Sequence, residues 1–101
     1  MKYALSLSVL GLSVMLSNAA FAESAGEKLF NQKCAMCHKV KGKGGAIGPD
    51  LSKVGGKLAE AQLREKLANP KKSNPGSSMP AFATLPKGDM DALVGFLKGL
   101  K

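Results

Sequence analysis

Five consecutive residues, Cys34-Ala35-Met36-Cys37-His38, constrain this chain more than any other feature, because they read CxxCH. Two cysteines three positions apart fit on one helical turn, so both thiols can add to the two vinyl groups of a single porphyrin. The adjacent imidazole can then ligate the iron from the same side. The motif predicts one covalently attached haem c, bound through Cys34 and Cys37, with His38 as an axial ligand of the iron.

Two other kinds of site use a CxxC spacing. A structural zinc site needs about four ligands, usually cysteine and histidine, and the chain has only two cysteines and one histidine. A carboxylate would have to complete such a site. A thioredoxin-like dithiol would place the motif at the head of a helix in a βαβ unit, but no alternating or continuous β-branched run surrounds it. Both alternatives are therefore weaker than haem.

The first 22 residues have the pattern of a secretory signal peptide. Lys2 is followed by a mostly apolar stretch over residues 4–16, and Ala20-Phe21-Ala22 is an A-x-A cleavage site. The alternative is an uncleaved anchor, since a segment of this length approaches the minimum for a membrane span. Its four serines and the small-residue site favour cleavage. We expect a mature domain over residues 23–101, in the periplasm or in the thylakoid lumen of a photosynthetic cell, with no stable membrane insertion.

The chain is basic, with 15 lysines and arginines against 7 acidic residues. Removing Lys2 with the leader leaves a net charge of +7. Lysines 39, 41 and 43 follow the CxxCH motif, so part of this charge is expected beside the haem. Such a rim attracts and orients an acidic redox protein in a transient complex, although any single lysine is explained equally well as a solvated surface residue. Nucleic-acid binding is not expected, because residues 23–101 contain no Trp or Tyr for base stacking.

Three helices are predicted and no strand. Ser24 and Glu27 fit a capping box that opens the first helix, which runs into the CxxCH motif. The second runs from residue 58 or 59 to residue 69 and is stopped by Pro70. The third begins near residues 87–89, has a broad apolar face and runs to the C-terminus. The fold class is therefore all-α, with three main helices wrapped around one haem in one domain.

The segments between these helices are predicted to be irregular. Residues 40–48 are rich in Gly and Lys and lead into Gly48-Pro49-Asp50-Leu51. The carbonyl of Pro49 is free to accept a hydrogen bond, and an iron-bound imidazole usually donates its second N–H to such an acceptor. A loop returning past His38 supplies that acceptor.

The second axial ligand must come from the other side of the ring, and His38 is the only histidine. Methionine is the natural soft donor. Two of the five methionines leave with the leader, Met36 is fixed on the His38 side, and Met90 has the leucine spacing of a core position. Met79, on the segment after the second helix, is the remaining candidate.

With these motifs the chain resembles class I c-type cytochromes over nearly the whole of residues 23–101. Besides CxxCH, the resemblance rests on Gly48-Pro49-Asp50-Leu51 and on residues 69–79, which follow the NPKKxxPGxxM pattern of mitochondrial cytochromes c. Met79-Pro80-Ala81-Phe82 is similar to small bacterial and photosynthetic relatives. The absence of the longer haem-covering loop of mitochondrial members favours the short bacterial type.

The resemblance implies a role for each matching position. Cys34 and Cys37 would carry the thioether bonds, His38 and Met79 would be the axial pair, and the Pro49 carbonyl would orient His38. Ser77 stands where the family often has a threonine that hydrogen-bonds a haem propionate. The first helix would cross the last through Gly26 and Phe30, near Leu93 and Phe96. Lys66 departs from the family by replacing a tyrosine near the methionine sulfur, and the Trp that commonly meets a propionate is absent.

If both axial positions are taken, no coordination site remains for a substrate. The expected function is that of a soluble, monomeric one-electron carrier between respiratory or photosynthetic partners, and not an enzyme. Two alternatives stay open. One is a haem sensor or peroxidase-like enzyme in which Met79 leaves the iron readily, and the other is a permanent electron-transfer subunit of a larger oxidoreductase.

Overall fold

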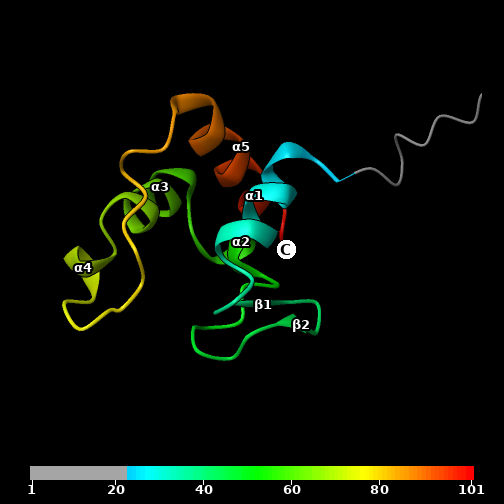
Figure 1. Ribbon diagram of the computed structural model, residues 1–101, viewed down its shortest axis with the longest axis horizontal. Coiled ribbons are helices and arrows are strands. Elements are labelled where there is room, and N and C mark those ends of the chain that lie inside the picture. The colour runs from blue at the N-terminus through cyan, green and yellow to red at the C-terminus, as the bar shows by residue number, and fades with distance from the viewer. Residues whose placement is uncertain (1–22) are drawn as a thin grey trace, which may run out of the picture.

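The computed structural model describes residues 23–101, and the predicted leader lies outside the described residues. This part of the chain forms five helical segments and one short strand pair, arranged as in Figure 1. In order they are α1 (Ala25–Lys33), β1 (Lys39–Val40), β2 (Lys43–Gly44), α2 (Val54–Lys57), α3 (Glu60–Ala68), α4 (Pro70–Ser73) and α5 (Lys87–Lys98). The longest three, α1, α3 and α5, are the predicted helices, and the all-α prediction is confirmed.

The start of α1 shows one half of the predicted capping box, the bond to the Ser24 side chain. Ser24 is the N-cap, and its Oγ accepts a hydrogen bond from the Glu27 N–H at 3.1 Å. The helix ends at Lys33, and the N–H groups of Cys37 and His38 both donate to the Cys34 carbonyl, at 3.1 and 2.9 Å. The CxxCH motif is therefore a separate turn that continues directly from α1.

Helices α1 and α5 cross at a glycine. Gly26 is buried, and a Cβ at this position would overlap the Ala92 carbonyl oxygen and lie 2.7 Å from the Phe96 Cβ. One turn later the rings of Phe30 and Phe96 pack with centroids 5.5 Å apart, a normal separation for an aromatic pair. The predicted crossing is confirmed, with Ala92 as the nearest neighbour of Gly26.

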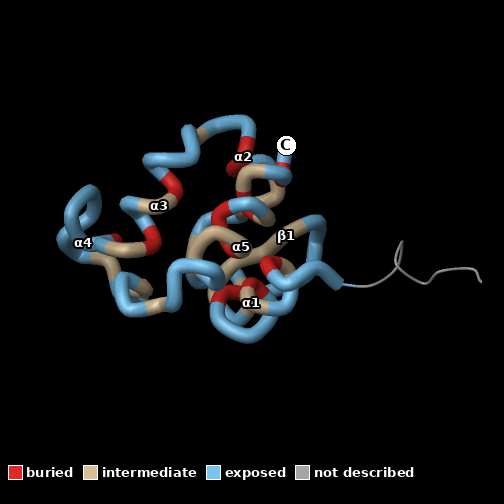
Figure 2. The backbone as a smooth tube through the Cα atoms, turned by 90° about the horizontal axis from the view of Figure 1, so that it is seen from above, coloured by how far each residue is buried: buried red, intermediate tan, exposed pale blue. Residues whose placement is uncertain are grey.

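The core lies between α5 and the inward faces of the other helices, as the burial colours of Figure 2 show. Its buried apolar residues are Phe30, Cys34, Val54, Leu63, Leu67, Leu93, Val94, Leu97 and Leu100. One of the cysteines of the CxxCH motif thus belongs to the core.

The lysine- and glycine-rich stretch is more regular than predicted. Its residues form a minimal antiparallel ladder, with Lys39 opposite Gly44 and Val40 opposite Lys43. Between the strands, Lys41 and Gly42 both have positive φ, 52° and 81°. Two such residues make the tight turn that matches the twist of a hairpin, so the glycine content that suggested irregular structure instead permits the reversal.

Two single-turn helices also go beyond the prediction. Pro70, which ends α3 as expected, is the first residue of α4, where its missing N–H is not needed. Helix α2 is held by the C-terminal end of the chain. The Gly55 N–H donates to the Leu100 carbonyl at 2.6 Å, and the Lys98 ammonium donates to the Gly55 and Leu58 carbonyls at 2.9 and 3.0 Å.

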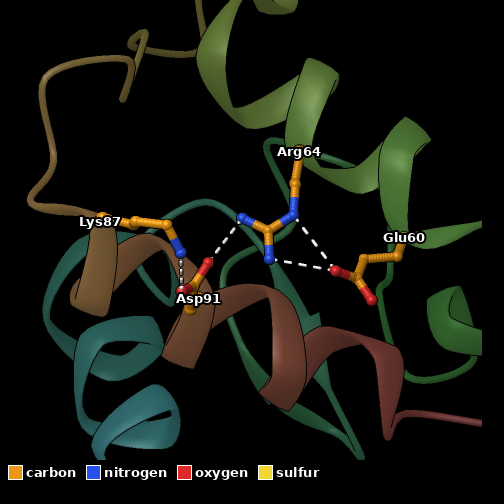
Figure 3. Close-up of polar contacts among 4 residues, drawn as sticks. All are labelled: Glu60, Arg64, Lys87 and Asp91. Carbon is orange, nitrogen blue, oxygen red and sulfur yellow. Dashed lines mark hydrogen bonds and ion pairs between the residues drawn. The ribbon is translucent and has the colours of Figure 1, made fainter.

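A chain of ion pairs joins α3 to α5 on the surface, as Figure 3 shows. Arg64 contacts Glu60 of its own helix at 3.1 Å and Asp91 of α5 at 2.8 Å, and Lys87 contacts Asp91 at 2.9 Å. Hydrogen bonds from Lys87 and Arg64 hold the pKa of Asp91 below its ordinary value.

Among residues 23–101, no helix is long and apolar enough to cross a membrane.

Candidate haem-binding site

A cleft of about 420 Å³ opens between the core and the segments around α3 and α4, a size within the usual range of ligand pockets. Its lining comes from residues 33–58, from residues 63–82 and from Leu97 of α5. All six residues predicted for the site line this one cleft, namely Cys34, Cys37, His38, Pro49, Ser77 and Met79. The structure thus brings together residues that lie up to 45 positions apart in the sequence. That they bind haem remains a prediction.

The imidazole of His38 is fixed by a backbone carbonyl. Its Nδ1 lies 2.8 Å from the Pro49 oxygen, and because a carbonyl can only accept, Nδ1 carries the proton. The lone pair is therefore on Nε2, the nitrogen that remains available to a metal. This is the contact predicted between His38 and Pro49.

Gly48 allows this contact, a role that the sequence alone does not predict. A Cβ at this position would lie 2.5 Å from the His38 Cε1 and 2.8 Å from its Nδ1. The Gly48 N–H also donates to the Cys37 carbonyl at 2.7 Å, so the loop is fastened to the CxxCH turn. The sequence signal for this role is that a glycine directly precedes Pro49, whose carbonyl accepts the hydrogen bond from His38.

Both cysteines are unpaired thiols in this structure, and Cys34 is buried. Burial raises the pKa of the Cys34 thiol to about 11, while the charge of Lys33 acts in the opposite direction. Reactive redox dithiols instead have a lowered thiol pKa. The environment of Cys34 therefore does not favour this residue as the nucleophilic thiol of a redox dithiol.

The described residues offer no further ligands for a zinc site. Within residues 23–101, no group of three or more His, Cys, Asp or Glu side chains converges in a way that would hold a metal ion. The donors at the cleft are instead two thiols, one imidazole and one thioether.

Met79 is half-buried, on the segment between α4 and α5. Ser77 holds its backbone, because the Ser77 Oγ accepts from the Met79 N–H at 3.1 Å, and the Ser77 hydroxyl proton remains able to donate. Further along, the Phe82 N–H donates to the Leu67 carbonyl of α3 at 2.7 Å. The segment that carries Met79 is thus tied to α3, beside which it passes in Figure 1.

The other methionines in the described residues lie elsewhere. Met36 is 83% exposed and Met90 packs against the core, and neither lines the cleft. The core position of Met90 is the one that its leucine spacing predicts, and Met36 lies outside the cleft.

The remaining lining suits a large apolar ring that carries negative groups. Most of the lining surface is apolar, and the aliphatic and aromatic side chains that contribute to it are Ile47, Leu51, Val54, Leu58, Leu63, Leu67, Phe82 and Leu97. Besides His38, the ionisable side chains are two thiols and the ammonium groups of Lys33 and Lys66, and no carboxylate of the described residues lines the cleft. Apolar walls, cationic groups, two thiols and two potential axial donors together fit haem c.

The comparison with protein families supports this interpretation. The family model described as Cytochrome c matches residues 23–101. The chain belongs to the cytochrome c family. Family membership assigns it haem-based electron transfer.

Individual relatives extend the comparison. Cytochrome c of Chlamydomonas reinhardtii is 37% identical over 95 residues, covering 72% of this cytochrome and 84% of the relative. Cytochrome c oxidase subunit 2 of Alkalihalophilus pseudofirmus is 31% identical over an alignment of 85 residues, which covers 75% of this cytochrome and 25% of that subunit. A chain in the crystal structure of SoxXA from P. pantotrophus superposes with a TM-score of 0.67 and 25% identity, covering 76% of this cytochrome and 80% of that chain.

Proposed function

We propose that this cytochrome is an exported one-electron carrier whose single haem c is bound covalently by Cys34 and Cys37 and ligated axially by His38 and Met79. The observation that carries the proposal is that these four side chains line one cleft. When bound, the haem supplies the iron that alternates between the ferrous and ferric states.

The residues of the cleft prepare the site for this role. The Pro49 carbonyl directs the proton of His38 to Nδ1 and leaves Nε2 as the donor atom. Ser77 fixes the backbone of Met79, and the apolar side chains of the cleft suit the porphyrin ring. If His38 and Met79 both ligated the iron, no coordination position would be left for a substrate, so the proposed protein is a carrier and not an enzyme.

The proposed location is the periplasm, or the thylakoid lumen of a photosynthetic cell, on the strength of the leader pattern in residues 1–22. The proposed partners are acidic redox proteins that bind transiently to a monomer. Lys41 and Lys43, which follow the CxxCH turn, are exposed, so their charges are available to steer such a partner. A small interface suits rapid exchange of partners.

A permanent subunit of a larger oxidoreductase is the second candidate, and the similarity to cytochrome c oxidase subunit 2 favours it. The two candidates share the haem chemistry and differ in assembly. The size of the protein extracted under mild conditions separates them, because a carrier elutes as a monomer and a subunit elutes with its partners.

Replacement of Met79 tests the proposed ligand set. Met79→Leu keeps the side-chain volume but removes the sulfur donor, so the haem should stay covalently bound while the reduction potential falls. The reduced variant should also bind carbon monoxide. Met90→Leu is the matched control, because Met90 packs against the core, and its potential and spectrum should be those of the unsubstituted protein.

Two results would count against the proposal. An unchanged potential and spectrum in Met79→Leu would remove Met79 from the iron. Ready binding of carbon monoxide to the reduced, unsubstituted protein would favour the sensor or peroxidase-like alternative, in which the methionine ligand is labile.

A further inference from the structure

The charged side chains that line the cleft are all positive. Its two charged aliphatic side chains are Lys33 and Lys66, and no carboxylate of residues 23–101 lines it. The acidic residue next to Lys66 faces a different partner, since the Glu65 carboxylate contacts the Lys72 ammonium at 2.8 Å. The charge of Lys66 also helps to lower the pKa of Glu65, after the larger effect of Lys72. An anionic group that enters the cleft therefore meets positive charge and no carboxylate among the lining residues.

Lys66 is positioned by the helix that carries it. It lies between Leu63 and Leu67 of α3, which are buried and line the same cleft. Its ammonium donates to the Ser73 Oγ of α4 at 3.0 Å, and Ser73 also lines the cleft. An ammonium has three donor hydrogens, so this contact orients the group and leaves two hydrogens for an anion.

The two lysines differ in their surroundings. Lys33 ends α1 beside Cys34, and its charge acts on the Cys34 thiol. Lys66 contacts the hydroxyl group of Ser73, which lines the same cleft and keeps its own proton for donation. A carboxylate beside Lys66 can thus receive a charge-assisted hydrogen bond together with a neutral one.

We propose that Lys66 binds a propionate carboxylate of the haem, with Ser73 holding its ammonium in place. The inference rests on the proposed binding of haem. A fixed positive charge at the propionate offsets its negative charge, and that negative charge favours ferric over ferrous iron. Lys66 therefore raises the reduction potential as a positioning residue for the haem carboxylate.

Four variants of the haem-loaded protein test this role. Lys66→Gln and Lys33→Gln each remove one cleft charge, and Lys71→Gln removes an equal charge from α4 outside the cleft. Lys66→Arg restores the charge with a different geometry. Potentials are measured at high ionic strength, where distant surface charges are screened.

The expected result is a downward shift of the potential in Lys66→Gln that exceeds the shifts in Lys33→Gln and Lys71→Gln, with recovery in Lys66→Arg. A crystal structure of the haem-loaded protein should place the Lys66 Nζ within hydrogen-bond distance of a propionate oxygen. Equal shifts in all three glutamine variants, a larger shift in Lys33→Gln, or a propionate that contacts no Lys66 atom would overturn the assignment.

The outcome for Lys66 is distinguishable from the outcome for the proposed function. If haem is retained with methionine ligation but the potential is indifferent to Lys66, this inference fails and the carrier function stands. If the purified protein retains no haem after denaturing extraction, both fail.

Discussion

At the scale of single residues, the position of His38 depends on a neighbour that has no side chain. The loop passes so close to the imidazole that a Cβ on Gly48 would lie 2.8 Å from Nδ1, the same nitrogen that contacts the Pro49 oxygen. The hydrogen bond from His38 to Pro49 therefore requires the close approach of Gly48 to the imidazole.

Gly48→Ala should displace the His38 ring or the loop and weaken the Nδ1 contact with Pro49. Overpacking of this kind costs about 1–3 kcal/mol, so the haem-loaded variant should have a lower free energy of unfolding in denaturant titrations. Gly56→Ala is the control, because nothing lies within 4 Å of a Cβ there. Equal stability of the two variants would show that the loop adapts without cost.

The sequence indicates the candidate site residues, but it does not indicate the contacts that hold them in place. Cys34, Cys37 and His38 follow from one local motif, and Met79 follows by elimination. The bond from the Met79 N–H to Ser77 and the proximity of Gly48 to His38 depend on how the loops pack, which no local pattern encodes.

At the scale of helices, the crossing of α1 and α5 depends on Gly26. Gly26→Ala would place a methyl group against the Ala92 backbone, which cannot rotate away as a side chain could. We expect a loss of about 1–3 kcal/mol or more in unfolding free energy. Gly95→Ala, on α5 with open space around its Cβ, should instead stabilise by about 0.4–1 kcal/mol. A stable Gly26→Ala variant would contradict the observed crossing.

The ion pairs between α3 and α5 predict a dependence on pH. The pKa of Asp91 is lowered in the folded protein by its bonds to Lys87 and Arg64. Its contribution to stability is therefore present above the unfolded value of about 3.9 and is lost as pH falls through the lower folded value. Asp91→Asn should reduce stability at pH 7 and have less effect at pH 3.

Urea unfolding midpoints at the two pH values and at two salt concentrations measure this effect. The groups are exposed, so the difference at pH 7 should be small and should shrink in high salt. Asp89→Asn is the control, because no ion pair of Asp89 occurs among the described residues. A difference that does not change with pH would exclude the charge of Asp91 as its source.

The short elements show why part of the fold escapes prediction. The sequence of α2 includes Gly55 and Gly56, which are poor helix formers, and its turn is held by Leu100 and by Lys98, more than 40 residues away. The long helices, by contrast, carry their apolar faces locally, and α1 also begins at its own side-chain cap, Ser24. Prediction from sequence succeeds where the determinants are local and fails where distant residues impose the conformation.

At the scale of the whole molecule, the protein core and the cleft share part of their residues. Several core residues, including Cys34, Val54 and Leu63, also line the cleft. Small domains bury a limited share of their surface and often depend on an additional source of stability. A covalently held apolar ring in this cleft would complete the core and join residues 33–58 to the segment around Met79.

The visible spectrum of the exported protein, recorded oxidised and then reduced after denaturing extraction of loosely bound haem and refolding, tests the central claim most directly. The account predicts retained haem that is six-coordinate and low-spin, with the weak band of methionine bound to ferric iron. Retained high-spin haem would contradict the His38 and Met79 ligand set and favour the sensor or peroxidase-like alternative. An absence of retained haem would return Cys34 and Cys37 to thiol or metal chemistry.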